Sequence, residues 1–140
     1  MMETKEKLAR NLGRTLLAWS LPSIVFGVIL SFVSDPFIQG IGLQAILWGV
    51  IDAVIALAGF YRKQDQSAEK MAKILLINVF LDIGYQVVGL LLVTFLWQNL
   101  YILGNGAGVI IQGAFLFCLD LYYYLKFKRL GETRQANQPD

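Results

Sequence analysis

Four long apolar stretches restrict what this chain can fold into more than any other feature of its sequence. They cover about residues 15–33, 36–61, 68–97 and 105–127. A helix needs about 20 predominantly apolar residues to cross the hydrocarbon core of a bilayer, and each stretch is close to that length or longer. We therefore predict an all-α fold in which four transmembrane helices form an antiparallel, up-down-up-down bundle.

Local signals set several helix boundaries. Asp35 is placed to cap the second helix, with Pro36 at its first position, where the missing N–H costs nothing. Ser67 is placed to cap the third helix. We interpret Gly104-Asn105-Gly106 as a breaker, after which the fourth helix begins near Asn105.

The length of the chain allows one domain only. Residues 1–129 are predicted to form a single four-helix membrane domain, in which the first fourteen residues extend the first helix into the cytoplasm. Residues 130–140 are polar and are predicted to be a disordered cytoplasmic tail.

The basic residues predict which side of the membrane each connection faces. All of them lie outside the apolar stretches or at their edges: before the first, between the second and third, and after the fourth. They are Lys5, Lys7, Arg10, Arg14, Arg62, Lys63, Lys70, Lys73, Lys126, Lys128, Arg129 and Arg134. The other two connections contain none. Because cytoplasmic loops carry an excess of Lys and Arg, both termini are predicted to be cytoplasmic. Trp19 and Trp97 are assigned to the aromatic belts at the inner and outer interfaces.

Composition excludes several kinds of site. The chain has no His and one Cys, so a His-ligated metal, a Ser-His-Asp triad, an internal disulfide and a paired-cysteine zinc site are all ruled out. We also expect no metal, no cofactor and no enzyme activity. Intramembrane enzymes that bind a metal through carboxylates need several aspartates within one or two helices, and here each helix holds at most one. Nucleic-acid binding is not expected either, because the basic residues lie at the membrane edge with no basic domain beyond them.

Three acidic residues, Asp52, Asp82 and Asp120, lie inside the apolar stretches. A charged side chain at the centre of a spanning helix costs about 2.5–3.5 kcal/mol on insertion scales. Counted from the nearest basic residue, Asp52 and Asp82 lie at a similar depth, roughly 13–15 Å along their helices, and Asp120 is shallower. Neither Asp52 nor Asp82 has a Lys or Arg at its depth, so we expect each to carry a proton or to hold a cation.

Other polar residues lie at helical spacing from these aspartates. Asn78, Asp82 and Gln86 repeat every four residues and share one face of the third helix. The second and fourth helices each carry a glutamine eight residues before their aspartate. The candidate intramembrane polar site comprises Asp52, Asp82, Asp120, Asn78, Gln86, Gln44, Gln112, Ser23 and Tyr85.

Several motifs resemble an uncharacterised bacterial family of small four-helix integral membrane proteins, a domain of unknown function. They are Asn78-Val-Phe-Leu-Asp82-Ile-Gly-Tyr85, Gly104-Asn105-Gly-Ala-Gly108, Gln112-Gly-Ala-Phe-Leu and the segment from Gln44 through Trp48-Gly-Val-Ile-Asp52. The resemblance extends from the first helix to Asp120 and implies the four-span topology and a bacterial inner membrane. It implies no mechanism.

Two functions remain open at this point. In the first, the chain is a small transporter or channel-like protein whose aspartates handle protons or a small cation. In the alternative, it is a non-catalytic scaffold, accessory subunit or assembly factor, and the aspartates form interhelical hydrogen bonds worth about 0.6 kcal/mol each. Both predict the lipid bilayer and a second membrane subunit, identical or different, as partners. Convergence of Asp52, Asp82 and Asp120 on one cavity would favour the first.

Overall fold

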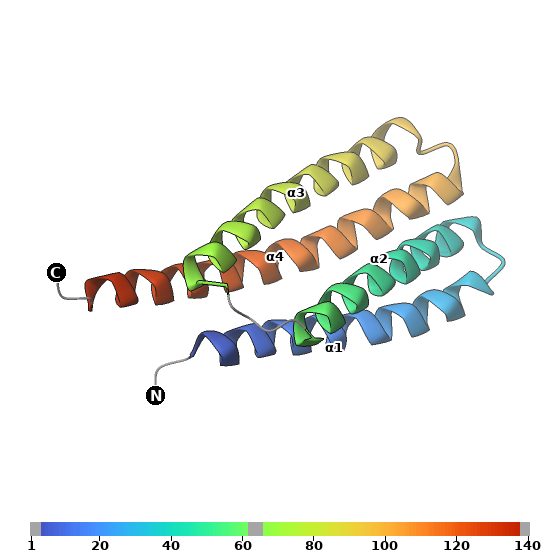
Figure 1. The fold of residues 1–140 in the computed structure, drawn as a ribbon. Helices are drawn as coiled ribbons and strands as arrows, with labels where there is room; N and C mark the ends of the chain where they lie inside the picture. The colour runs from blue at the N-terminus through green and yellow to red at the C-terminus, as the bar shows by residue number, and fades with distance from the viewer. Residues whose placement is uncertain (1–3, 62–65, 138–140) are drawn as a thin grey trace.

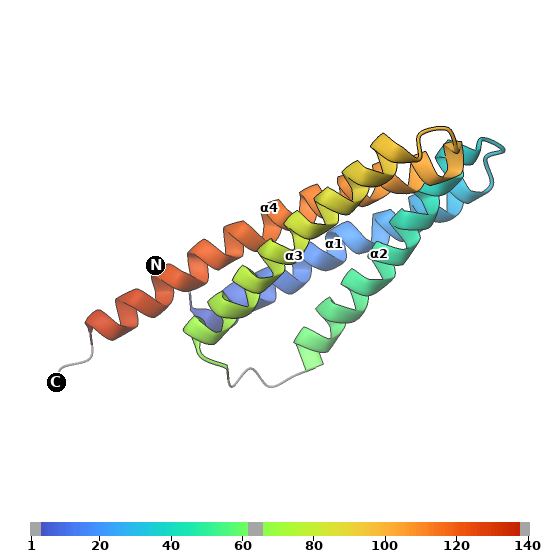
Figure 2. The ribbon, with the colours of Figure 1, turned by 90° about the horizontal axis from the view of Figure 1, so that it is seen from above.

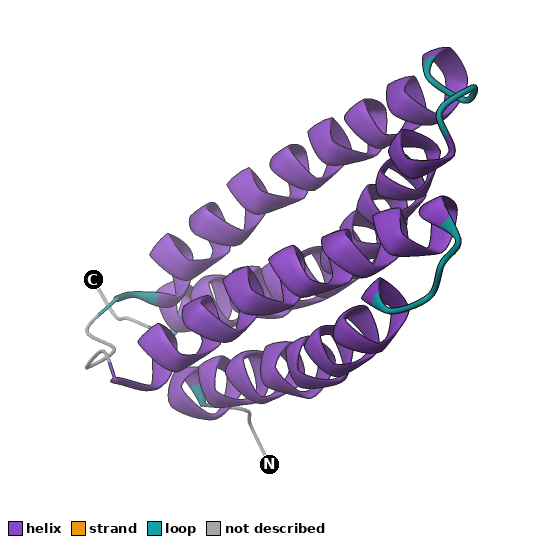
Figure 3. Ribbon diagram, turned by 90° about the vertical axis from the view of Figure 1, so that its right-hand side faces the viewer, coloured by secondary structure: helices purple, strands orange, loops and turns teal. Residues whose placement is uncertain are grey.

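The computed structural model describes residues 4–61 and 66–137, which form four α-helices. They are α1 (Lys5–Ser31), α2 (Pro36–Tyr61), α3 (Ala68–Phe95) and α4 (Leu100–Ala136). The described residues include no strand (Figure 3). Each helix is long and apolar enough to cross a membrane. The prediction of an all-α fold with four helices of membrane-spanning length is confirmed.

Successive helices run in opposite directions (Figure 1). The two termini lie together at one end of the bundle, which we call the termini end. The turns that join α1 to α2 and α3 to α4 lie at the other end, the hairpin end. The basic residues Arg62 and Lys63, predicted for the connection between α2 and α3, lie outside the described residues.

Side-chain caps fix where the helices begin. Asp35 Oδ1 accepts hydrogen bonds from the backbone N–H groups of Phe37 (2.8 Å) and Ile38 (3.2 Å), so α2 begins at Pro36 as predicted. The Ser67 side chain accepts from the Lys70 N–H at the start of α3, also as predicted. Such caps satisfy backbone donors that have no partner within the helix.

The start of α4 differs from the prediction. The helix begins at Leu100, where the Asn99 side chain accepts from the N–H groups of Tyr101 and Ile102, and Gly104-Asn105-Gly106 is helical. Both glycines lie inside the helix, against neighbouring helices. Glycine stands there because a residue with a side chain would not fit. A Cβ atom on Gly104 would collide with the carbonyl oxygen of Phe37 in α2.

The end of α4 also corrects the prediction of a disordered tail from residue 130. The helix continues to Ala136 and projects past the other helices at the termini end (Figure 2). Its last turns contact the start of α3, since Gln135 Nε2 donates to Glu69 Oε1 at 2.9 Å and Gly131 is buried against the Glu69 side chain. Residues 138–140 lie outside the described residues.

The helices pack in the order α1, α2, α4, α3, which Figure 1 shows from bottom to top. The bundle therefore consists of two hairpins, α1–α2 and α3–α4, joined mainly through α2 and α4. Buried apolar side chains from all four helices gather toward the termini end, among them Leu8, Ala56, Leu75 and Phe127. This cluster closes the bundle on that side.

The two hairpins repeat the same close contacts. A Cβ atom on Gly27 would lie 2.7 Å from the carbonyl oxygen of Gly42, where α1 crosses α2. Where α3 crosses α4, a Cβ atom on Gly89 would lie 3.0 Å from the carbonyl oxygen of Gly106. Small residues allow helices to approach this closely when lipid provides no hydrophobic drive for association.

The sequence carries the same repeat. Residues 35–49 (DPFIQGIGLQAILWG) align without gaps with residues 99–113 (NLYILGNGAGVIIQG), and the two segments share a capping Asp or Asn, Phe or Tyr, two isoleucines and three glycines. The hairpins also contact each other reciprocally. A Cβ atom on Gly40 would meet the carbonyl oxygen of Tyr101, and one on Gly104 would meet that of Phe37. Reciprocal contacts between equivalent residues are what a two-fold axis produces, so the fold is a pseudo-symmetric pair of hairpins.

Candidate functional site

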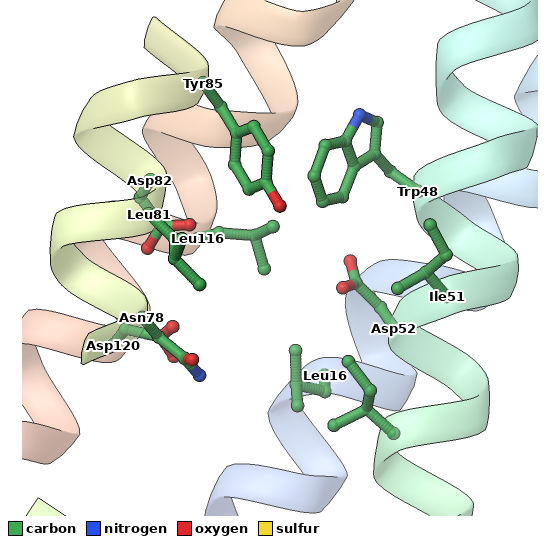
Figure 4. A pocket seen from close by; sticks show the side chains of 11 residues that line it. Leu16, Trp48, Ile51, Asp52, Asn78, Leu81, Asp82, Tyr85, Leu116 and Asp120 are labelled. Carbon is green, nitrogen blue, oxygen red and sulfur yellow. The ribbon is translucent and has the colours of Figure 1, made fainter. Parts of the chain in front are cut away.

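A cavity of about 200 Å³ lies between α2 and α3, and α1 and α4 contribute to its walls (Figure 4). Eleven residues line it: Leu16, Trp48, Ile51, Asp52, Ile55, Asn78, Leu81, Asp82, Tyr85, Leu116 and Asp120. The side chains of Ile51, Ile55 and Leu81 are about half exposed, so the cavity opens on the outer surface of the bundle between α2 and α3.

All three aspartates singled out in the sequence line this one cavity. Asp52 belongs to α2, Asp82 to α3 and Asp120 to α4. Asp52 is 2% exposed and Asp82 is 3% exposed. Figure 4 shows their carboxyl groups on opposite walls, directed into the space between them.

The aspartates differ in their hydrogen-bond partners. The Asp120 carboxyl group has a side-chain hydrogen bond with Asn78. In contrast, Asp52 Oδ2 and Asp82 Oδ2 are buried without a hydrogen-bond partner among the residues that the structure describes. Unpaired buried polar groups are costly in a protein interior, so these two oxygen atoms need an explanation.

Two aromatic side chains form the wall of the cavity nearer the hairpin end. The rings of Trp48 and Tyr85 meet edge to face, with 4.8 Å between centroids and an interplanar angle of 70°. Tyr85 was predicted as a site residue, but Trp48 was not. Trp48 precedes Asp52 by one helical turn, and this spacing was a signal that both share one face of α2.

The remaining predicted site residues lie elsewhere. Three amides join helix pairs: Gln44 Nε2 donates to Asn105 Oδ1 (2.7 Å), Gln86 Nε2 donates to the Ile110 carbonyl oxygen (3.1 Å), and Gln112 Oε1 accepts from Trp19 Nε1 (2.8 Å). Ser23 is buried in α1 but does not line the cavity. Of the nine predicted residues, the cavity therefore brings together Asp52, Asp82, Asp120, Asn78 and Tyr85.

Trp19, which was predicted for the inner aromatic belt, is half-buried and packs between α1 and α4. Its indole ring stacks on Phe115 of α4, with 3.9 Å between centroids and 10° between the planes. The hydrogen bond to Gln112 fixes the same ring against α4. Aromatic stacking and a partner for the indole N–H are both available between the helices, so the residue is held there.

The pseudo-symmetry accounts for the position of the cavity. When Gly27 is aligned with Gly89, Trp19 of α1 corresponds to Leu81 of α3. Trp19 fills the space between α1 and α4. The equivalent space between α3 and α2 holds only the smaller Leu81, and there the cavity lies.

Among residues 4–61 and 66–137, no three His, Cys, Asp or Glu side chains are arranged to hold a metal ion. Within the same residues, the cavity is lined by carboxyl, amide, phenol and apolar groups, with no Lys or Arg. Its chemistry is therefore that of a partly apolar pocket that contains acidic groups and no basic one.

No curated protein and no solved structure matches the chain. One family model does match, over residues 15–121, a range that contains every residue lining the cavity. The chain belongs to this family of unknown function, DUF6992.

Proposed function

We propose that the chain is a multi-pass protein of the bacterial inner membrane with both termini in the cytoplasm. The length and apolar composition of the four helices support insertion. The distribution of Lys and Arg supports the orientation, because none lies in the sequence of either hairpin turn. Cysteines introduced one at a time in a Cys118→Ser background would test the orientation. A cysteine near residue 134 should react with impermeant maleimide only in opened cells, whereas one at residue 98 should react in intact cells.

Within the membrane, we propose that the aspartates of the cavity bind and release protons or a small cation during transport. The unpaired, buried carboxyl oxygens of Asp52 and Asp82 carry this proposal. A carboxylate in a spanning helix costs about 2.5–3.5 kcal/mol. A purely structural residue would recover part of that cost through hydrogen bonds, as the glutamines do. A carboxyl group with an unpartnered oxygen is instead available to an exchangeable ion.

The alternative is a non-catalytic scaffold, accessory subunit or assembly factor. The three amide hydrogen bonds between helices favour such a role for Gln44, Gln86 and Gln112. None of these three hydrogen bonds involves Asp52 or Asp82, so they do not support a structural role for the two aspartates. We assign no catalytic activity in either case, and we expect a second membrane subunit, another copy or a different protein, to complete the working unit.

Ion flux in proteoliposomes distinguishes the two functions. Purified protein is reconstituted with a pH-sensitive dye inside the vesicles, and a potassium diffusion potential drives protons inward. Sodium uptake is measured in parallel. The proposal predicts flux of one of these ions above that of empty vesicles. Asp52→Asn and Asp82→Asn should abolish this flux, while the melting temperature in detergent stays almost unchanged.

Asp35→Asn provides a matched control, because it makes the same chemical change in the hairpin turn and Asn caps helices as well as Asp. Its flux should equal that of the wild type. Absence of flux in the wild type, together with melting or aggregation of Asp52→Asn and Asp82→Asn, would establish the scaffold role instead.

A further inference from the structure

We propose that the cavity between α2 and α3 binds a small organic ammonium ion, with Asp52 and Asp82 as counter-charges and Trp48 and Tyr85 as its aromatic wall. This inference rests on the proposed function and names the class of substrate. It follows from four properties of the cavity: its charge, its aromatic corner, its size and its opening.

The charge of the cavity requires a positive ligand. Each of three helices contributes one carboxyl group, namely Asp52 from α2, Asp82 from α3 and Asp120 from α4. Asp120 already interacts with Asn78. The side chains of Asp52 and Asp82 are more than nine-tenths buried, their carboxyl groups are directed into the cavity (Figure 4), and one oxygen of each has no hydrogen-bond partner among the described residues. A cation between the latter two would have an acidic side chain on either side of it (Figure 4).

The walls favour an organic cation over a metal ion. Hard cations such as Mg²⁺ and Ca²⁺ need six or more oxygen ligands in a close shell, whereas leucine and isoleucine side chains make up much of this wall. Methyl or methylene groups attached to an ammonium nitrogen could contact Leu16, Leu116 and Ile51, and such an ion loses less hydration energy than a small metal ion on entering the cavity.

The aromatic corner provides the recognition element that alkylammonium ions use elsewhere. Cations within about 6 Å of an aromatic centroid are attracted to the ring face, most strongly by Trp, and sites for quaternary ammonium groups are commonly built from such rings. Because Trp48 and Tyr85 are close to perpendicular, they present surfaces in two directions. Both rings lie beside the space between Asp52 and Asp82 (Figure 4).

Size and access restrict the ligand further. The cavity holds about 200 Å³, which is smaller than the roughly 300–1,000 Å³ of pockets for drug-sized molecules. It opens sideways past the half-exposed Ile51, Ile55 and Leu81. In a membrane this opening would face the acyl chains, a route that suits a cation with an apolar shell.

Binding would exchange one positive charge for another. A proton leaves a carboxyl group when the ammonium ion enters, so the total charge in the cavity is unchanged. The titratable groups that face this site are Asp52 of α2, Asp82 and Tyr85 of α3 and Asp120 of α4, and α1 contributes only Leu16. Because proton and ammonium ion compete for the same carboxylates, ammonium binding should weaken as the pH falls.

Isothermal titration calorimetry of the full chain in detergent tests the proposal. The probe is tetramethylammonium chloride, with tert-butanol as an uncharged molecule of similar shape and KCl as a control for ionic strength. We expect saturable heat with tetramethylammonium alone, weaker binding at acidic pH, and release of protons that shows as a dependence of the heat on the buffer used.

Variants locate the site. Asp52→Asn and Asp82→Asn should each abolish the heat, and Trp48→Leu should weaken binding roughly 5–30-fold, the range that loss of a desolvated cation–π contact produces. Trp97→Leu, at an exposed position, and Asp35→Asn should bind like the wild type. Melting temperatures near that of the wild type establish that each variant is folded.

The outcomes separate this inference from the proposed function. No saturable heat with the wild type, or equal heat with wild type and Asp52→Asn, overturns the ammonium site. If the proteoliposomes still carry protons or sodium in an aspartate-dependent way, the proposed function stands without it. If they carry neither and no heat is seen, both are overturned.

Discussion

The indole ring of Trp19 lies flat on the ring of Phe115, with centroids 3.9 Å apart, and fills the space between α1 and α4. By the pseudo-symmetry of the two hairpins, the equivalent pair is Leu81 and Ile51. Both of these residues line the cavity instead of filling it. A near-symmetric bundle thus holds one closed and one open space between its hairpins, and the open one is lined by the two carboxyl groups that each have an unpartnered oxygen.

Replacing Trp19 with Leu, the residue at the equivalent position of α3, should open the closed space. The variant loses the stack on Phe115 and leaves the buried Gln112 without its indole donor. We expect the free energy of unfolding to fall by about 2–4 kcal/mol, the sum of a lost aromatic pair and an unsatisfied buried amide. Thermal or denaturant unfolding in detergent, followed by circular dichroism, measures the change. Trp97→Leu, at an exposed position, should change it by less than about 0.5 kcal/mol.

Gly104→Ala tests the close approach of α2 and α4. The added Cβ would collide with the Phe37 carbonyl oxygen, and backbone cannot move aside as a flexible side chain can. The cost of overpacking should be about 1–3 kcal/mol. Gly84→Ala is the matched control, because no atom lies within 4 Å of its added Cβ. That variant should gain up to about 1 kcal/mol from helix propensity. Equal melting temperatures for the two variants would contradict the packing described here.

Substitution by leucine should change the free energy of unfolding in opposite directions for buried polar residues with and without a hydrogen-bond partner. Asp52→Leu removes a buried carboxyl group with one unpartnered oxygen and should raise the free energy of unfolding by about 1–3 kcal/mol, since apolar replacement of buried charge is often stabilising. Gln112→Leu removes the acceptor of the Trp19 indole and should lower it by about 1 kcal/mol. Chemical denaturation in mixed micelles compares the two. Destabilisation by Asp52→Leu as large as that by Gln112→Leu would indicate a structural aspartate.

Much of the fold was predictable from the sequence because membrane-spanning helices satisfy their own backbone and need long apolar runs. The caps at Asp35 and Ser67 were predictable because they depend on two or three neighbouring residues only. The start of α4 was mispredicted because local rules treat Gly104 and Gly106 as breakers. Their effect in the structure comes from contacts with other helices, Gly104 with Phe37 of α2 and Gly106 with Gly89 of α3, which rules based on neighbouring residues do not include.

The candidate site was predicted in part for a similar reason. Helical spacing and depth placed Asp52, Asp82 and Asp120 in inward-facing layers, and these three residues do line one cavity. The same criteria also selected Gln44, Gln86 and Gln112, because spacing alone cannot tell a cavity wall from a helix contact. The repeat of residues 35–49 in residues 99–113 was present in the sequence. That Trp19 and Leu81 occupy equivalent positions follows from the helix contacts, which align Gly27 with Gly89, and not from the sequence alone.

Leu81→Trp tests most directly whether the cavity is the functional site. The substitution places at this position the side chain that closes the equivalent space beside α1, and it leaves all three aspartates intact. A matched Leu90→Trp variant adds the same ring at an exposed position of α3. In the proteoliposome flux assay, we predict that Leu81→Trp is folded and carries no ions, while Leu90→Trp equals the wild type. A folded Leu81→Trp protein with wild-type flux would contradict the account.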